Sequence, residues 1–248
     1  RSLLCLAVDR ARIDAELEQA ARTLAPQLRA ISAERVWMEL ERILAPPTRT
    51  CGWALLADWN IVDHIVEGWS PSDEQRRRIC ATFSALPPVE VQAHLIPAVL
   101  FADGSRSEVE ARCRALRLSN VVTAAALWLI QSRNFLGDAE AVSLADLKLL
   151  MAGPDWPGLL AFLRADWIAR RRGLEALDRV VHQAERIPPH EVTPPPLLSG
   201  DDLKAMGLSP GPDFGRILET VYRTQLEERI HSAEEARALV RTLVQDVA

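Results

Sequence analysis

The chain has 248 residues, of which 48% are hydrophobic and 25% are charged. This composition is typical of a soluble globular protein that buries one or two cores, and it excludes general disorder. The formal net charge of −5 provides no overall attraction to a polyanion, so any nucleic-acid contact must come from local basic patches. The cysteines form no CxxC pair and have no histidine at ligand spacing, so we expect buried, reduced thiols rather than a zinc site.

The sequence contains no sign of a membrane partner. No apolar run approaches the roughly 20 residues needed to span a bilayer, and the N-terminus lacks the order of regions that marks a signal peptide. We therefore expect a cytoplasmic location. The chain opens on Arg1 within a helix-like pattern and without an initiator methionine, so it is expected to be a piece of a longer protein.

Helix signals occur along the whole chain, whereas no segment has the alternation or the β-branched content of a strand. Leu17, Leu24 and Leu28 share one apolar face, and Val36 and Leu40 share the next. Three later helix starts carry the pattern of a capping box, namely Ser72 with Gln75, Ser105 with Glu108, and Ser232 with Glu235. Further helices are predicted over residues 88–102, 119–135, 143–151, 156–172 and 173–187. The predicted fold class is all-α, with no sheet.

Proline-rich breaks divide the chain. Residues 187–196 cannot continue a helix, because proline lacks the backbone donor and restricts the residue before it, so an extended connector is predicted there. A lighter break falls at Pro46-Pro47. The predicted domains are therefore residues 1–45, 46–187 and 188–248.

After the connector, residues 197–218 predict a helix, a tight turn and a second helix. Ser199 is placed to cap the first helix, and Gly207 is placed to end it. Residues 210–212 form the turn, and Gly215 permits close approach of another backbone. Such a hairpin leaves free amides at a helix N-terminus, where a phosphate binds well. The alternative interpretation is a compact helical hairpin without a ligand.

Three stretches of the sequence carry extended motifs. The longest is L-L-S-G-D-D-L-x-x-x-G-L-x-P-G-P-x-F-G-x-I-L from Leu197, which Gln225-Leu226 and Glu234-Glu235-Ala236 follow. The others are residues 31–44 and the run Leu116-Arg-Leu-Ser-Asn120. Together these motifs resemble the C-terminal region of bacterial CCA-adding tRNA nucleotidyltransferases and their poly(A) polymerase relatives.

The resemblance implies an arrangement of parts. In this family a mixed α/β head carries the chemistry, a neck selects the nucleotide, and a helical body and tail hold the tRNA. The chain is accordingly expected to form an elongated array of a neck remnant, body and tail helices. Residues 1–14 correspond to the neck pattern R-A-V-R-F-A-A-R-x-x-F-x-I-D, but Leu4 and Val8 replace two of its arginines. The family's base-reading Asp and Arg are expected to precede Arg1.

The sequence lacks the residues that nucleotidyl transfer requires. The reaction needs paired carboxylates that bridge metal ions beside a Gly-Ser loop, whereas Asp201-Asp202 is predicted to cap a helix. A phosphohydrolase module is not expected either, because Asp63-His64 has the reverse order of its His-Asp pair. We expect no catalytic or metal-binding residue, no cofactor and no activity in this chain alone. Magnesium and nucleoside triphosphates are expected for a complete parent enzyme.

The candidate RNA contacts are backbone and basic residues. On and beside the hairpin they are Lys204, Gly207, Gly211, Gly215, Arg216 and Arg223, and before the connector they are Arg170, Arg171 and Arg172. A charge run such as residues 170–172 is usually a solvated helix face, and otherwise it grips phosphates without reading sequence. The seven tryptophans are scattered over helical patterns and are predicted to pack in the core rather than to stack on bases.

The leading hypothesis is therefore the tRNA-binding region of a tRNA nucleotidyltransferase-like protein. It would position the tRNA for addition of CCA or A to the 3′ end by a head domain outside the chain. The alternative is a helical protein-interaction or dimerisation scaffold that has lost RNA binding. The choice among CCA, A and poly(A) addition depends on head and neck positions.

Overall fold

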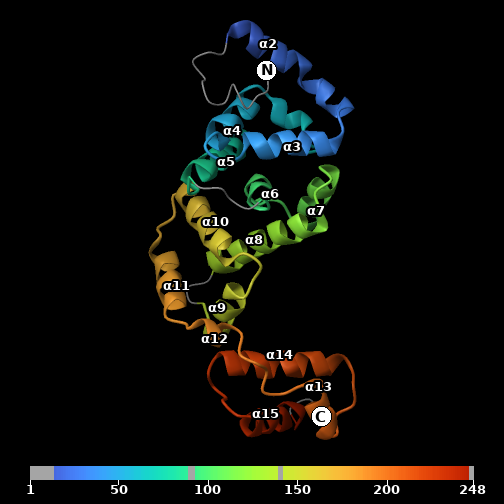
Figure 1. The fold of residues 1–248 in the computed structure, drawn as a ribbon, viewed down its shortest axis with the longest axis vertical. Coiled ribbons are helices and arrows are strands. Elements are labelled where there is room, and N and C mark those ends of the chain that lie inside the picture. The colour runs from blue at the N-terminus through green and yellow to red at the C-terminus, as the bar shows by residue number, and fades with distance from the viewer. Residues whose placement is uncertain (1–13, 89–92, 139–141, 246–248) are drawn as a thin grey trace. The chain divides into compact units, whose positions relative to one another are not determined.

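The computed structural model describes residues 14–88, 93–138 and 142–245, and Figure 1 shows their helices. Within these ranges every regular element is a helix and no strand occurs, so the prediction of an all-α fold is confirmed. The chain divides into two compact units, of which the first comprises Arg1–Asp138 and Pro157–Leu177. The second comprises Ala139–Trp156 and Asp178–Ala248. No helix of the described residues is long and apolar enough to cross a membrane.

The first unit holds most of the apolar core. Its helices are α2 (Ala15–Leu24), η2 (Ala25–Ala30), α3 (Ala33–Ile43), α4 (Arg49–Asp58), η3 (Ile61–His64), α5 (Asp73–Ala85), α6 (Leu95–Leu100), α7 (Arg106–Ala115), α8 (Asn120–Asp138) and all but the first residue of α10 (Trp156–Ala169). Trp53 and Phe83 are fully buried with ring centroids 6.3 Å apart, and Trp69 and Phe101 form a T-shaped pair with ring centroids 4.9 Å apart. These aromatic contacts join α4 to α5 and fix the turn after α6.

The second unit consists of α9 (Leu144–Met151), most of α11 (Glu175–Glu185), α12 (Pro189–Val192), α13 (Gly200–Ala205), α14 (Pro212–Leu226) and α15 (Ala233–Gln245). Its apolar cluster forms where α13, α14 and α15 pack together (Figure 1). Leu203 and Ala236 are fully buried there, and Val221 and Val240 are nearly so. Ala236 and Val240 are four residues apart on α15, and the partly buried Phe214, Ile217 and Leu218 precede Val221 at helical spacing on α14, so each helix presents one apolar face to the cluster.

Local signals placed most helix starts correctly. The capping boxes at Ser72 and Ser105 are present in both directions, which confirms those predictions. At Ser232 the side chain accepts from the Glu235 amide, but the Glu235 carboxylate accepts from the amide of His231 instead of that of Ser232. The third capping box is therefore displaced by one residue.

Three predicted segments differ from the structure. The helix over residues 88–102 is represented by α6 alone among the described residues, because Pro97 is tolerated only in the first turn of a helix. α10 ends at Ala169 because Arg171 adopts a left-handed conformation with φ 56° and closes the helix. The connector is not fully extended, since Pro188 and Pro189 open the short helix α12.

Of the predicted buried thiols, Cys51 is exposed, Cys113 is buried and Cys5 lies outside the described residues.

A network of arginines and aspartates crosses the first unit. Arg133 on α8 is nearly buried and lies 3.4 Å from Asp166 on α10, and it also donates to the carbonyl of Ala102 at 2.7 Å. Arg170 bonds both to Asp166 at 2.9 Å and to Asp103 at 2.7 Å. Because each of these groups has lost most of its water, the charges must satisfy one another.

Asp103 connects this network to α5 through an ion pair with Arg78. Burial alone would raise the pKa of Asp103, but the hydrogen bond from Arg170 and the charges of Arg78 and Arg133 hold that pKa below its ordinary value. Burial lowers the pKa of Arg133, and the nearby charge of Asp166 partly opposes that shift. Asp103 is therefore held in its charged form by Arg78 on α5, Arg133 on α8 and Arg170 just after α10.

Replacing Asp166 by Asn should destabilise the first unit by about 3 kcal/mol, since it leaves a buried guanidinium without its main carboxylate. The measurement is chemical denaturation followed by tryptophan fluorescence, which reports mainly this unit because Trp156 alone lies in the second. Glu39→Gln is the matched control, since it removes an exposed pair with Arg42 and should cost under about 0.5 kcal/mol. Equal losses in the two variants would contradict a structural role for the network.

The lowered pKa of Asp103 predicts how stability depends on pH. Its contribution is present above the ordinary carboxyl value of 3.8 and is lost as pH falls through the lower value of the folded state. The Asp103→Asn variant should therefore lose less unfolding free energy than the wild type when titrated through that acid range. Glu67→Gln, which alters an exposed carboxylate without a partner in the described ranges, should follow the wild-type profile.

Candidate nucleic-acid interface

The tail hairpin begins with a fully formed cap. The Ser199 hydroxyl accepts from the Asp202 amide at 3.3 Å, while the Asp202 carboxylate accepts from the Ser199 amide at 2.9 Å. The Ser199 hydroxyl also donates to the Asp202 carboxylate at 2.6 Å, and this bond, together with the one from the Ser199 amide, holds the pKa of Asp202 below its ordinary value. The predicted capping role of Asp201-Asp202 is therefore confirmed for Asp202, whereas Asp201 is exposed and pairs with Lys204.

Gly207 ends α13 as the sequence predicts. Its φ is 87°, and its amide donates to the Lys204 carbonyl at 2.9 Å while the Leu208 amide donates to Leu203 at 3.2 Å. This pair of bonds is the Schellman arrangement, which satisfies the carbonyls left free at a helix end. The left-handed backbone at Gly207 turns the chain toward α14.

The start of α14 has no side-chain cap. Gly211 occupies the N-cap position with extended backbone, and Pro212 takes the first helical position, as predicted. The amide of Phe214 donates to the Gly211 carbonyl at 3.1 Å, and no side chain accepts from the first turn. Asp213 also lies in this turn, and its carboxylate would repel an incoming anion. The ion pair with Arg216 neutralises that carboxylate. No atom of the chain lies within 4 Å of a Cβ built on Gly215, so the predicted close approach of another backbone does not occur within the described residues.

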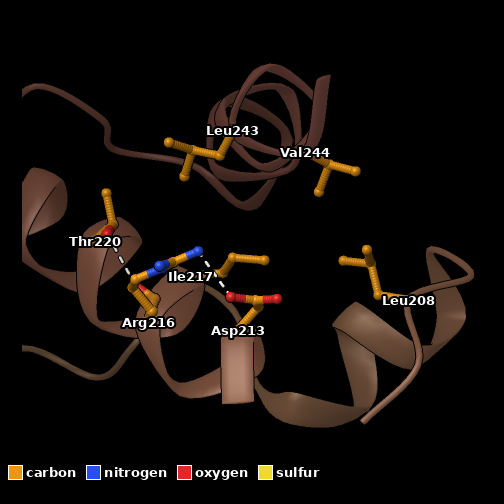
Figure 2. A pocket seen from close by; sticks show the side chains of 7 residues that line it. All are labelled: Leu208, Asp213, Arg216, Ile217, Thr220, Leu243 and Val244. Carbon is orange, nitrogen blue, oxygen red and sulfur yellow. Dashed lines mark hydrogen bonds and ion pairs between the residues drawn. The ribbon is translucent and has the colours of Figure 1, made fainter. Parts of the chain in front are cut away.

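A hollow of about 280 Å³ opens beside this turn, between α14 and α15. Figure 2 shows Leu208, Ile217, Leu243 and Val244 around it, with the ion pair of Arg216 and Asp213 at its edge. Arg216 donates to Asp213 at 2.7 Å, and both side chains are about two thirds exposed, at 66% and 64%. The hollow therefore has an apolar lining and a charged rim.

Lys204 and Arg216 are the hairpin cations best placed to meet a phosphate. Lys204 lies 2.8 Å from Asp201 and its side chain is 56% exposed. Ion pairs within an exposed helix turn contribute little to stability, so either cation can exchange its carboxylate for a phosphate at small cost. Both positions remain candidates.

Arg223 is held by the protein itself. Its guanidinium donates to Asp146 on α9 at 2.7 Å and lies 3.5 Å from Glu219. Burial alone would raise the pKa of Asp146, but the hydrogen bonds from Arg223 and Ser143 keep that pKa below its ordinary value. Arg223 joins α14 to α9 and is less available to RNA than its place in the sequence suggests.

Further contacts fasten the end of α14 within the second unit. The Glu227 carboxylate accepts from the Ala145 amide at 2.9 Å, and Glu228 pairs with Lys148 at 2.9 Å. The Lys148 side chain is only 3% exposed. Tyr222 and Gln225 donate to carbonyls of Pro194 and Pro195, at 3.2 and 2.8 Å. The tail hairpin is thus attached to α9 and to the connector.

The basic run before the connector separates into different roles. Arg170 belongs to the buried network and is a structural residue. Arg171 is exposed at a left-handed position and has no ion-pair partner among the described residues. Arg172 is exposed and stacks over Trp167 at 4.6 Å. The run lies in the first unit and the hairpin lies in the second.

Several exposed cations were not singled out from the sequence. Arg29 and Arg35 have no carboxylate partner within the described part of the chain. Arg29 has no acid three or four residues away, a signal that could have identified it. Arg35 could not have been identified in this way, because Glu39 follows it by four residues but pairs with Arg42 instead. Within the described ranges, no cluster of His, Cys, Asp or Glu could hold a metal ion.

The helical units and the capped hairpin with its packed third helix have the fold of the helical region of CCA-adding enzymes. The structure of such an enzyme with CTP matches 98% of this chain and 59% of its own, with a TM-score of 0.66 and 14% identity. The Thermotoga maritima CCA-adding enzyme complexed with tRNA matches 99% of this chain and 60% of its own, with a TM-score of 0.59 and 15% identity. The chain therefore covers 59% and 60% of these structures.

Sequence comparison leads to the same group of proteins. Residues 12–72 match a family described as the probable RNA and SrmB-binding site of polymerase A. A stretch of 85 residues is 34% identical to the CC-adding tRNA nucleotidyltransferase of Thermus thermophilus, covering 34% of this chain and 20% of that protein. The chain resembles the helical C-terminal region of CCA-adding tRNA nucleotidyltransferases and poly(A) polymerases. The family match lies in the first unit, whereas the hairpin motif lies in the second.

Gly207→Ala should destabilise the second unit by roughly 1–2 kcal/mol, because a side chain is strained at a left-handed backbone position. No atom lies within 4 Å of the added Cβ, so the expected effect is backbone strain alone. Chemical denaturation followed by far-ultraviolet circular dichroism measures it. Gly211→Ala is the matched control: its backbone is extended and the nearest atom to a Cβ is 3.9 Å away, so it should be nearly neutral. A neutral Gly207→Ala would show that the turn can rearrange.

Proposed function

We propose that this chain holds the backbone of a tRNA and positions its 3′ end for nucleotide addition by a catalytic head. The observation that carries the proposal is the match of residues 12–72 to a family described as a probable RNA-binding site. The similar protein from Thermus thermophilus is a CC-adding tRNA nucleotidyltransferase, and a similar solved structure contains a tRNA. Magnesium and nucleoside triphosphates would belong to the head.

The tail hairpin is one proposed contact surface. The uncapped first turn of α14 offers backbone N–H groups, and Lys204 and Arg216 provide exposed positive charge nearby. Acidic residues on the hairpin weaken any long-range attraction, so binding must depend on short contacts in which a phosphate displaces Asp201 or Asp213. Such contacts fix the position of an RNA without reading its sequence.

The first unit supplies the other proposed surface. Arg29 and Arg35 lie in the matched segment, and Arg171 and Arg172 are exposed after α10. Arg29, Arg35 and Arg171 have no carboxylate partner among the described residues, so each can meet a phosphate without first losing an ion pair. Double-helical RNA presents regularly spaced phosphates and 2′-hydroxyls, so separate basic positions suit recognition by shape.

A second candidate function is a helical scaffold that binds another protein or a second copy of the chain. Large apolar side chains are exposed in the matched segment, namely Leu24 at 52%, Ile31 at 45% and Met38 at 52%. The description of the matched family also includes a protein partner. This candidate predicts association that depends on these apolar residues and not on salt.

Titration of the full chain with a tRNA and with an unrelated RNA duplex, at low and moderate salt, tests the proposal. We expect tRNA binding that weakens as salt rises. The Lys204→Gln/Arg216→Gln double variant should bind more weakly and reduce the salt slope by up to about 2, since each lost phosphate contact removes up to about one unit. Arg77→Gln is the matched control, because it removes an exposed arginine of α5 that has no partner among the described residues, and it should leave the slope unchanged.

The outcomes separate the two candidates. No tRNA binding at micromolar protein and low salt would exclude the RNA proposal. If the chain then sediments as a dimer that Met38→Lys dissociates, the scaffold is supported. Binding that the double variant does not weaken would remove the hairpin side chains from the interface, and Arg171→Gln with Arg172→Gln would then test the first unit.

A further inference from the structure

A hollow of about 370 Å³ lies between α7 and α8 in the first unit. On the α7 side it is lined by Arg106, Glu110 and Arg114, which follow one another at four-residue spacing and so share one stripe of the helix. On the α8 side the lining residues are Asn120, Thr123, Ala124, Leu127, Trp128 and Gln131, which recur at spacings of three and four residues. Both helices therefore turn one continuous face toward the hollow.

The α8 face combines an aromatic ring with unused amides. Leu127 is buried and Trp128 is half-buried, so this face adds apolar surface and an accessible indole to a hollow that is otherwise lined largely by polar side chains. The side-chain amides of Asn120 and Gln131 are exposed and have no hydrogen-bond partner among the described residues. The Thr123 hydroxyl, by contrast, is bonded to the buried thiol of Cys113, whose pKa burial raises to about 11. The free donors and acceptors of this face are thus the two amides.

The α7 face adds one uncompensated positive charge. Arg106 pairs with Glu110 at 2.9 Å, which neutralises both groups. Arg114 is exposed and has no carboxylate partner among the described residues, although Glu110 precedes it by only four positions. The charge next to the indole and the amides is therefore a single guanidinium.

We propose that this hollow binds one unpaired nucleotide. The base would contact the indole of Trp128, the amides of Asn120 and Gln131 would bond its edge, and Arg114 would hold the phosphate. Aromatic stacking and amide pairing are the means by which proteins take up unpaired bases, and a guanidinium matches phosphate oxygens in geometry and charge. The volume lies within the ordinary range of small-ligand pockets, about 300–1,000 Å³.

This site goes beyond shape recognition of a tRNA, because it would take a base out of a stack. It also does not depend on the tail hairpin, since all of its residues belong to the first unit. The nucleotide could be free or could belong to an RNA strand, and both sources present the same base and phosphate. A fully paired duplex presents neither an exposed base face nor a free base edge, so it should not enter.

Fluorescence anisotropy of a labelled single-stranded pentaadenylate, with AMP as competitor, measures binding to the full chain. Trp128→Leu should weaken binding about tenfold or more, whereas Trp128→Phe should retain most of it, because the ring face is kept. Arg114→Gln should weaken binding severalfold and reduce the salt slope by about 0.7. Competition by AMP would identify a free nucleotide as sufficient, and binding of the pentamer alone would identify an RNA strand as the ligand.

The controls separate a binding effect from misfolding and from the proposed tRNA function. Arg77→Gln, an exposed arginine on α5, should leave pentaadenylate affinity unchanged, and Gln131→Leu tests the hollow at an exposed position that the fold does not need. Absence of binding by both probes, or equal affinities of wild type, Trp128→Leu and Gln131→Leu, would overturn the proposal. These probes contain no duplex, so the result is independent of whether the chain binds tRNA.

Discussion

The first unit depends on the attraction between Arg133 and Asp166 inside a nearly dry interior. Their helices, α8 and α10, are separated in the chain by α9, which belongs to the other unit, so this pair fixes a contact that the chain connection alone does not. Arg170 and Asp103 extend the same network toward α5 through Arg78. A buried charge without its partner is costly, and one incorrect packing of these helices would leave several charges unpaired. The network therefore favours the one packing of α5, α8 and α10 in which all of these charges are paired.

Charge pairing also limits where a polyanion can bind. The chain has a net charge of −5, and many of the described cations already face carboxylates, either in the buried network or along exposed helix turns. Other exposed cations, such as Arg29 and Arg171 in the first unit and Arg229 in the second, have no carboxylate partner among the described residues. A protein with this distribution attracts RNA weakly at long range and holds it by specific short contacts. Affinity then depends on shape as much as on charge.

The sequence predicted the features that depend on neighbours in the chain. The caps at Ser72, Ser105 and Ser199 and the left-handed Gly207 follow from local chemistry, and the all-α fold follows from helical periodicity. The sequence did not predict features that depend on contacts between residues distant in the chain. Arg171 adopts the left-handed conformation that ends α10, and Arg223 binds Asp146, which lies 77 positions earlier. Four-residue spacing predicts that Arg35 pairs with Glu39 and that Arg114 pairs with Glu110. In the structure Glu39 pairs with Arg42 and Glu110 pairs with Arg106.

The attachment of the tail to α9 has a consequence for how the molecule opens. The Glu227 carboxylate accepts a hydrogen bond from the Ala145 amide at the start of α9. Glu228 forms an ion pair with the buried Lys148, and Arg223 binds Asp146. Detaching α14 would leave an ammonium group in an apolar setting and a helix start without its acceptor. The backbone amides of α9 should therefore exchange with solvent together with those of the tail, as one cooperative element, although α9 lies between α8 and α10 in the chain. Motion of the tail would then be accompanied by motion of α9, the helix inserted in the chain between α8 and α10.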